Sequence, residues 1–377
     1  MLNMIWKDLL MNGLPINVRL NQSLRFSDMR LFITIGIAVL ILACSQQHKQ
    51  AEIKEVSLSG TSKASKWPDK LSAWELFDLP MANLKPAEGV FPYDINSALF
   101  SDYAFKARFI KLPKDSAMGY QPSSTLDFPV GSVLIKNFYY PEDFNKPDGK
   151  MRILETRLLV HENEGWLAVP YVWNKEQTEA HLEVAGATVA ASWKDTKGVT
   201  IDLNYSVPNQ VQCKSCHERN GKFSPIGPNA RQLNRDGQLE QWKEAGLLTG
   251  LPENHIPKLT NYNDETALIK DRARAWLEIN CAHCHSPEGP AKNTGLYLFA
   301  SQTDDYKLGL NKPPVAAGRG SGGLKYGIVP GNAENSILYH RIKSLDPGVM
   351  MPELGRKMEH KEGVALIKEW IDGMVVN

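Results

Sequence analysis

The pentapeptide Cys-x-x-Cys-His occurs twice in this chain of 377 residues, as CKSCH at 213–217 and as CAHCH at 281–285. The two copies contain four of the five cysteines, and histidine is scarce, with nine in the whole chain. In each copy two sulfurs and an imidazole must reach a common ligand from a single helical turn. This repeated motif constrains the fold more than any other feature of the sequence.

The spacing of the motif suits one cofactor in particular. Sulfurs two residues apart on a helical turn can form thioethers with the two vinyl groups of a haem, and the adjoining histidine then supplies an imidazole nitrogen to the iron. We therefore expect two covalently bound haem c groups, haem 1 held by Cys213, Cys216 and His217, and haem 2 held by Cys281, Cys284 and His285.

Three other uses of paired cysteines were weighed. A four-cysteine zinc site has a middle spacer of roughly 15–20 residues, whereas 64 residues separate Cys216 from Cys281. A thioredoxin-like redox pair needs a βαβ setting and no following histidine. Structural disulfides, common in exported proteins, do not explain why a histidine follows each pair.

The N-terminal segment predicts export and a lipid anchor. Residues 31–43 are thirteen uncharged apolar residues that end directly before Cys44, which suits the core of a signal peptide and is too short to span a bilayer. The stretch ILAC at 41–44 resembles a bacterial lipobox, whose cysteine is lipidated. We expect a signal peptide over 1–43, with Met29 as an alternative start, and a polar tether over 44–66; an uncleaved membrane anchor is the alternative. Ser45 favours the outer membrane by analogy, and the expected location is the periplasmic side of the cell envelope.

The charge balance argues against a nucleic-acid partner. The formal net charge is +1 for the whole chain and falls to −1 without residues 1–43, because that segment holds four basic and two acidic residues. Nucleic-acid binding requires a marked excess of positive charge. The expected partners are therefore redox proteins, together with the membrane through Cys44.

The fold class we predict is multidomain, with an N-terminal antiparallel all-β domain followed by mostly α, cytochrome c-like haem regions. Over 67–206, runs of alternating or β-branched residues are separated by turns, and ENEG at 162–165 and DTKG at 195–198 are good hairpin connections. This pattern predicts a sandwich or barrel-like sheet.

The haem 1 region is expected over 207–262, packed against its neighbours because it is small. Pro228 follows His217 by eleven residues and could offer a carbonyl to orient the imidazole. No methionine lies between Glu218 and Asp264. The sixth ligand of haem 1 is therefore His255, a histidine of another region, or absent; the other candidates are His161, His181 and His340.

The haem 2 domain is expected over 263–377. One amphipathic helix is expected before CAHCH, with Asn263 or Asp264 as its N-cap, and another near the C-terminus, with Gly373 as its stop signal. Between them lies VMMPELG, and Met351, directly before Pro352, is the predicted sixth ligand of the iron held by His285, with Met350 as the alternative. In this pairing of CxxCH with a later Met-Pro, the domain resembles small cytochromes c. Many of those carry a Gly-Pro after the haem histidine, whereas TGLYL at 294–298 lacks the proline, so what orients His285 is left open.

The lipobox, CKSCH with PIGPNARQLNRD, and CAHCH with VPGNAENS and MMPELG together resemble an uncharacterised family of bacterial diheme c-type cytochromes. The resemblance implies cofactors and location but no substrate. We expect an electron carrier that works by outer-sphere transfer and has no catalytic residues. The alternatives are a peroxidase-like oxidoreductase with an open haem 1 iron, and a haem-containing sensor or dehydrogenase subunit.

Overall fold

The computed structural model describes residues 66–375. The signal peptide, Cys44 and nearly all of the tether expected from the sequence lie outside this range. All of the described residues belong to one compact unit. No helix within 66–375 has the length and apolar character needed to cross a membrane.

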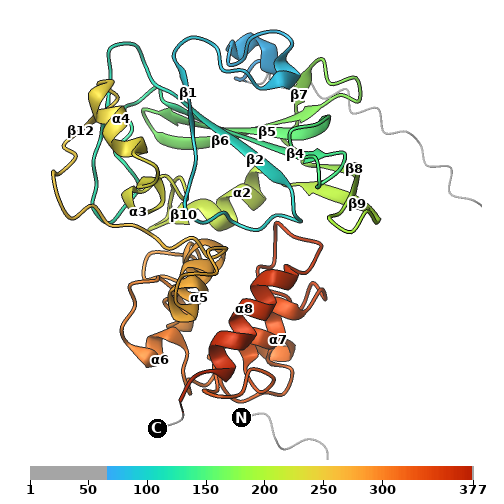
Figure 1. Ribbon diagram of the computed structural model, residues 1–377, viewed down its shortest axis with the longest axis vertical. Coiled ribbons are helices and arrows are strands. Elements are labelled where there is room, and N and C mark those ends of the chain that lie inside the picture. The colour runs from blue at the N-terminus through green and yellow to red at the C-terminus, as the bar shows by residue number, and fades with distance from the viewer. Residues whose placement is uncertain (1–65, 376–377) are drawn as a thin grey trace, which may run out of the picture. The chain divides into compact units, whose positions relative to one another are not determined.

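The β-rich half contains a six-stranded antiparallel sheet with strand order β1-β2-β4-β5-β6-β7 (Figure 1). Its strands are β1 (Val90–Tyr93), β2 (Phe105–Lys111), β4 (Val133–Pro141), β5 (Met151–Glu162), β6 (Gly165–Trp173) and β7 (Ala180–Leu182). The separate ribbon of β8 (Ala187–Lys194) and β9 (Thr200–Val207) contributes buried side chains to a cluster with β4 and β5. Both predicted hairpin connections are confirmed, since ENEG joins β5 to β6 and DTKG joins β8 to β9.

The two faces of the sheet are covered by different parts of the chain. One face packs against the N-terminal segment that contains η1 (Leu71–Trp74) and η2 (Met81–Asn83), with Ile135 and Leu158 fully buried in this cluster. The opposite face holds two apolar patches. Leu134 packs with side chains from residues 233–251, and Phe138 packs with the β8–β9 ribbon.

The segment expected to carry haem 1 is built on this second face. It comprises α2 (Gln210–His217), β10 (Glu218–Arg219), β11 (Lys222–Phe223), α3 (Ala230–Leu233), α4 (Gln238–Glu244) and β12 (Leu248–Thr249), which pairs in parallel with β3 (Met118–Gly119). Leu233, Leu239 and Trp242 are buried in the same cluster as Leu134. The segment therefore shares its core with the sheet.

The C-terminal part has a core of its own, formed by α5 (Ile269–Leu277), α7 (Ile337–Lys343) and α8 (Lys361–Asp372), which lie together apart from the sheet (Figure 1). The rest of this part is loop with short turns, namely η3 (Glu278–Ala282), η4 (Lys292–Thr294), α6 (Asp305–Leu308) and η5 (Gly318–Ser321). The antiparallel β domain is thus present, whereas the mostly α character expected for the haem regions is not confirmed, because long loops separate their helices.

Helices α5 and α8 test the predictions made from the spacing of apolar residues. α8 buries Val364, Ile367 and Trp370 and ends at Gly373, as the apolar spacing predicts. The helix before CAHCH begins at Ile269 with Leu268 as its N-cap, so the expected cap at Asn263 or Asp264 is wrong. Asp264 instead accepts hydrogen bonds from Thr266 in a preceding turn.

Asp102 connects the β-rich half to the C-terminal part. Its Oδ1 accepts hydrogen bonds from the backbone N–H groups of Lys357 and Met358, both at 2.7 Å. The side chain is buried, and burial raises the pKa of this carboxyl group although the two N–H donors oppose the rise. Because this carboxylate satisfies two backbone donors, it fixes the loop that precedes α8 against the start of β2.

Candidate functional site

The first pentapeptide forms α2, whose start is set by a capping box between Asn209 and Gln212. Cys213 is buried, while Cys216 and His217 are partly buried. The His217 ring stacks on Phe223, with ring centroids 4.9 Å apart. His217 Nδ1 lies 2.8 Å from the carbonyl oxygen of Ser224. Because a carbonyl can only accept, Nδ1 carries the proton and Nε2 is left free to bind a metal.

This geometry corrects the expectation for Pro228. Its carbonyl accepts from the backbone N–H of Leu126 at 3.0 Å, and Ser224, seven residues after His217, provides the orienting carbonyl instead. Burial also lowers the pKa of His217 to about 3, so the imidazole is neutral and competent as a ligand at neutral pH.

The second pentapeptide begins inside η3, a wide π-helical turn that continues α5. His285 Nδ1 lies 3.2 Å from Thr294 Oγ1, and that hydroxyl donates its own hydrogen to the carbonyl of Ala291 at 2.7 Å. The hydroxyl oxygen therefore accepts from His285, and Nε2 is again free. Burial lowers the pKa of His285 to about 4. Thr294 is the first residue of the TGLYL stretch, so the orienting group that the sequence left open is a side chain.

The two pentapeptides lie side by side although 63 residues separate them along the chain. A ligand atom from each of Cys216, His283 and Cys284 lies within 4.8 Å of the other two. Cys284 Sγ also lies 3.7 Å from the carbonyl oxygen of Ser215. A hydrogen bond between the two thiols lowers the pKa of Cys216 and raises that of Cys284.

Contacts beyond the cysteines join the same two segments. The backbone N–H of Asn220 donates to the carbonyl of Glu288 at 2.8 Å, and Arg219 forms an ion pair with the Glu288 carboxylate. Arg231 of α3 pairs with Glu278 at 2.8 Å, and this ion pair is largely buried. The adjacency of the motifs therefore depends on several contacts along both segments.

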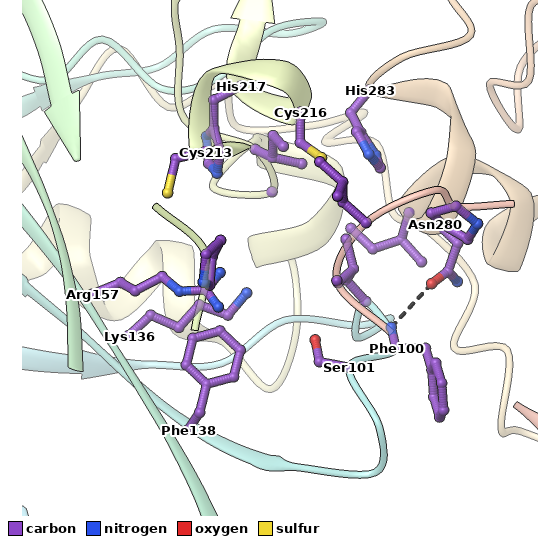
Figure 2. Close-up of a pocket in the computed structure, with 18 of the residues that line it drawn as sticks. Phe100, Ser101, Lys136, Phe138, Arg157, Cys213, Cys216, His217, Asn280 and His283 are labelled. Carbon is purple, nitrogen blue, oxygen red and sulfur yellow. Dashed lines mark hydrogen bonds between the residues drawn. The ribbon is translucent and has the colours of Figure 1, made fainter. Parts of the chain in front are cut away.

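A large cavity opens beside the first pentapeptide, with about 1620 Å³ of empty space when the part open to solvent is included. Figure 2 shows Cys213, Cys216 and His217 on one side of it, Lys136, Phe138 and Arg157 of the sheet on another, and Asn280 and His283 on a third. Asn280 Oδ1 accepts from the backbone N–H of Phe100 at 3.0 Å.

Met351 and Pro352 also line this cavity, whereas His285 does not. Met351 is tied to the second motif only indirectly. Its backbone N–H donates to the carbonyl of Arg341 at 3.0 Å, and the Arg341 guanidinium acts electrostatically on His285. Met350, the alternative ligand, is buried beside it. The predicted pairing of Met351 with His285 thus stays a prediction.

None of the four histidines considered as sixth ligand of haem 1 lines the cavity beside His217. His255 is exposed with a φ of 63°, and His181 is exposed beside Asp69. His161 lies 2.9 Å from the Phe128 carbonyl and stacks on Trp166. His340 packs against Gly322.

The histidines that do line the cavity besides His217 are His283 and His360, which the sequence arguments passed over. His283 Nδ1 is buried and has no hydrogen-bond partner among residues 66–375. His283 could have been noticed as the x residue of CAHCH itself. His360 Nδ1 accepts from Trp276 Nε1 at 2.9 Å, and its ring stacks on Phe100; no sequence signal marks it.

No family model, curated protein or solved structure matches this chain. The interpretation of the site therefore depends on its own geometry. The residues present fit a haem c, because each motif offers two thiols and an imidazole whose Nε2 is free, and the first motif borders a cavity with apolar walls. They also fit a small metal ion at Cys216, His283 and Cys284, a use of the same sulfurs that excludes thioether formation.

Proposed function

We propose that this protein is an extracytoplasmic diheme c-type cytochrome that carries electrons between redox partners by outer-sphere transfer. The observation that carries the proposal is the adjacency of Cys216 and Cys284, one from each pentapeptide. Two haems attached to neighbouring sulfurs lie close enough to exchange electrons, which is what a two-centre relay requires. A single haem on one motif gives no reason to bring the two motifs together, whereas a metal ion shared between them does, and the test below separates these two cases.

Each residue of the motifs has a distinct task in this proposal. Cys213, Cys216, Cys281 and Cys284 form the thioethers, and His217 and His285 bind iron through Nε2. The haem supplies a reversible one-electron couple, whose potential depends on axial ligands, hydrogen bonding and burial. Ser224 and Thr294 keep the two imidazoles in the ligating tautomer, and the many apolar side chains of the cavity wall reduce the contact of a bound group with water.

The direct test is the covalent haem content of the mature protein, produced in a host with the haem-attachment machinery and measured as pyridine haemochrome. We expect two haems per chain. Metal analysis of the same sample serves as the control, since stoichiometric zinc without covalent haem would refute the proposal in favour of a Cys216–His283–Cys284 metal site.

Met351→Ala tests the predicted axial ligand. A thioether sulfur raises the reduction potential of a haem, so its loss should lower the potential of one haem and leave that iron high-spin. Met358→Ala is the matched control, because Met358 packs beside the β8–β9 cluster instead. Identical spectra for wild type and Met351→Ala would exclude Met351 as a ligand.

A second candidate function is a peroxidase-like oxidoreductase in which the haem 1 iron is open. The observation that favours it is that none of the four predicted ligands, His255, His161, His181 and His340, lines the cavity beside His217. His283 and His360 do line it, so the spectra must also exclude them as ligands. Optical spectra with and without CO discriminate between the two functions. Two low-spin haems indifferent to CO support the carrier, whereas a CO-responsive haem that reacts with hydrogen peroxide supports the oxidoreductase.

Membrane attachment through Cys44 belongs to the same proposal. Cys44→Ser in the full chain should move the protein from the membrane fraction to the soluble fraction, because the lipid anchor is lost. Partitioning that does not change would contradict lipidation at Cys44.

A further inference from the structure

Three basic residues stand in a row across the sheet. Arg108 of β2 lies opposite Lys136 of β4, and Lys136 lies opposite Arg157 of β5. All three side chains therefore leave the sheet on the same face. Like charges in directly opposed positions destabilise a sheet, so this arrangement carries a cost that the fold itself does not explain.

The charges of the row are only partly compensated. Arg157 forms hydrogen bonds with both carboxylate oxygens of Glu155, at 2.8 and 2.5 Å. Arg108, whose side chain is 7% exposed, donates to the carbonyl of Lys106 at 3.4 Å, and its one acidic partner among residues 66–375 is Asp94 at 3.5 Å. Asp94 also pairs with Arg235 at 2.8 Å. The Lys136 side chain has no hydrogen bond or ion pair with any residue of 66–375, and its Nζ lies 4.9 Å from the centre of the Phe138 ring.

The apolar surroundings of the row make the lack of an acidic partner for Lys136 more destabilising. The row lies between the two apolar patches of this sheet face, with Leu134 on one side and Phe138 on the other. Burial lowers the pKa of Lys136 well below its ordinary value, and Arg108 and Lys106 lower it further. A basic group held among apolar side chains is stable when a ligand supplies the opposite charge.

The row faces the cavity beside the first pentapeptide. Arg108, Lys136 and Arg157 line the same space as Cys213 and His217. Figure 2 shows the head groups of Lys136 and Arg157 directed into the space beneath Cys213 and His217. A ligand in this cavity can therefore meet sulfur and imidazole at one end and the basic row at the other.

We propose that Arg108, Lys136 and Arg157 form a carboxylate-binding row for the ligand that occupies this cavity. Two guanidinium groups and an ammonium group offer charge-assisted hydrogen bonds of the kind that carboxylates accept. The carboxylates come either from the propionates of haem 1, which lie on the haem edge away from the thioethers, or from a free dicarboxylate. The first source depends on the proposed function, and the second does not.

The test compares Lys136→Met with wild type, in the full chain as it is purified. Methionine keeps the length and removes the charge. Lys114→Met is the matched control, because Lys114 is exposed beyond the end of β2, and Lys136→Arg should restore the wild-type behaviour. Two measurements are made on each protein: redox-difference infrared spectra with the haem potentials, and calorimetric titration with malonate.

If the propionates occupy the row, Lys136→Met shifts the carboxylate bands and lowers the potential of one haem, because a nearby positive charge favours the reduced haem. Malonate then has no effect. If a free carboxylate occupies it, malonate binds the wild type and binds Lys136→Met about tenfold more weakly, a loss of about 1.4 kcal/mol. Lys114→Met behaves as wild type in both cases.

The proposal is overturned if Lys136→Met matches wild type and Lys114→Met in both measurements. A chain without covalent haem fails the haemochrome test and so refutes the proposed function. The malonate titration still decides whether the row binds carboxylates.

Discussion

The two Cys-x-x-Cys-His segments share their two cysteines and final histidine but are stabilised in different ways. The first lies on the sheet, shares a core with it, and orients His217 through the backbone carbonyl of Ser224. The second continues α5, lies in a separate helical core, and orients His285 through the Thr294 hydroxyl. An identical motif can therefore depend on the rest of the chain in one place and on its own local core in another.

The largest expected effect comes from removing one pair of cysteines at a time. Cys213→Ala with Cys216→Ala, and Cys281→Ala with Cys284→Ala, should each halve the covalent haem, measured as haemochrome. The second pair should also lower the thermal unfolding temperature more, because Cys281 is buried in the helical core. If removal of the first pair alone abolished both haems, the second site would depend on the first. That result would contradict the view that the second motif depends on its own local core.

A smaller effect on folding stability is expected when the pH is lowered, because His360 then takes up a proton. Burial lowers its pKa to about 4, with Glu362 opposing the shift and Lys106 adding to it. Between about pH 6.5 and 4 the unfolded chain binds a proton at His360 that the folded chain does not, so stability falls as the pH falls through this window. The contribution is on the order of 3 kcal/mol.

Urea unfolding of wild type and His360→Asn at several pH values measures this contribution. Asparagine keeps an acceptor for Trp276 Nε1 and does not titrate. The variant should lose less stability than wild type between pH 6.5 and 4. Equal slopes would show that His360 does not connect the helical core to Phe100 in its neutral form.

The smallest expected effect concerns the groups that orient the two imidazoles, a side-chain hydroxyl for His285 and a backbone carbonyl for His217. Thr294→Val removes the acceptor of His285 Nδ1, one hydrogen bond worth about 1 kcal/mol. It should raise the potential of haem 2, because the imidazole becomes a weaker donor. Ser224→Ala keeps the backbone carbonyl and should leave haem 1 unchanged in the same redox titration. A shift for Ser224→Ala of equal size would remove the distinction between backbone and side-chain control.

Local patterns in the sequence were sufficient to predict the two hairpins and α8, because alternation, turn residues and helical spacing act over a few residues. They also identified the two Cys-x-x-Cys-His motifs, whose ligand stays a prediction. The adjacency of Cys216 and Cys284 could not be predicted, because it follows from long-range contacts such as Asn220 with Glu288. The basic row was equally hidden, since the opposition of Arg108, Lys136 and Arg157 depends on strand register.

The adjacency of Cys216 and Cys284 has a consequence for how the protein is assembled. A disulfide between these two sulfurs would take one thiol from each pentapeptide, so a single oxidation would block ligand binding by both pentapeptides together. An oxidising compartment favours such bonds. If the motifs carry haem as proposed, maturation must attach at least one haem, or keep this pair reduced, before the two segments come together.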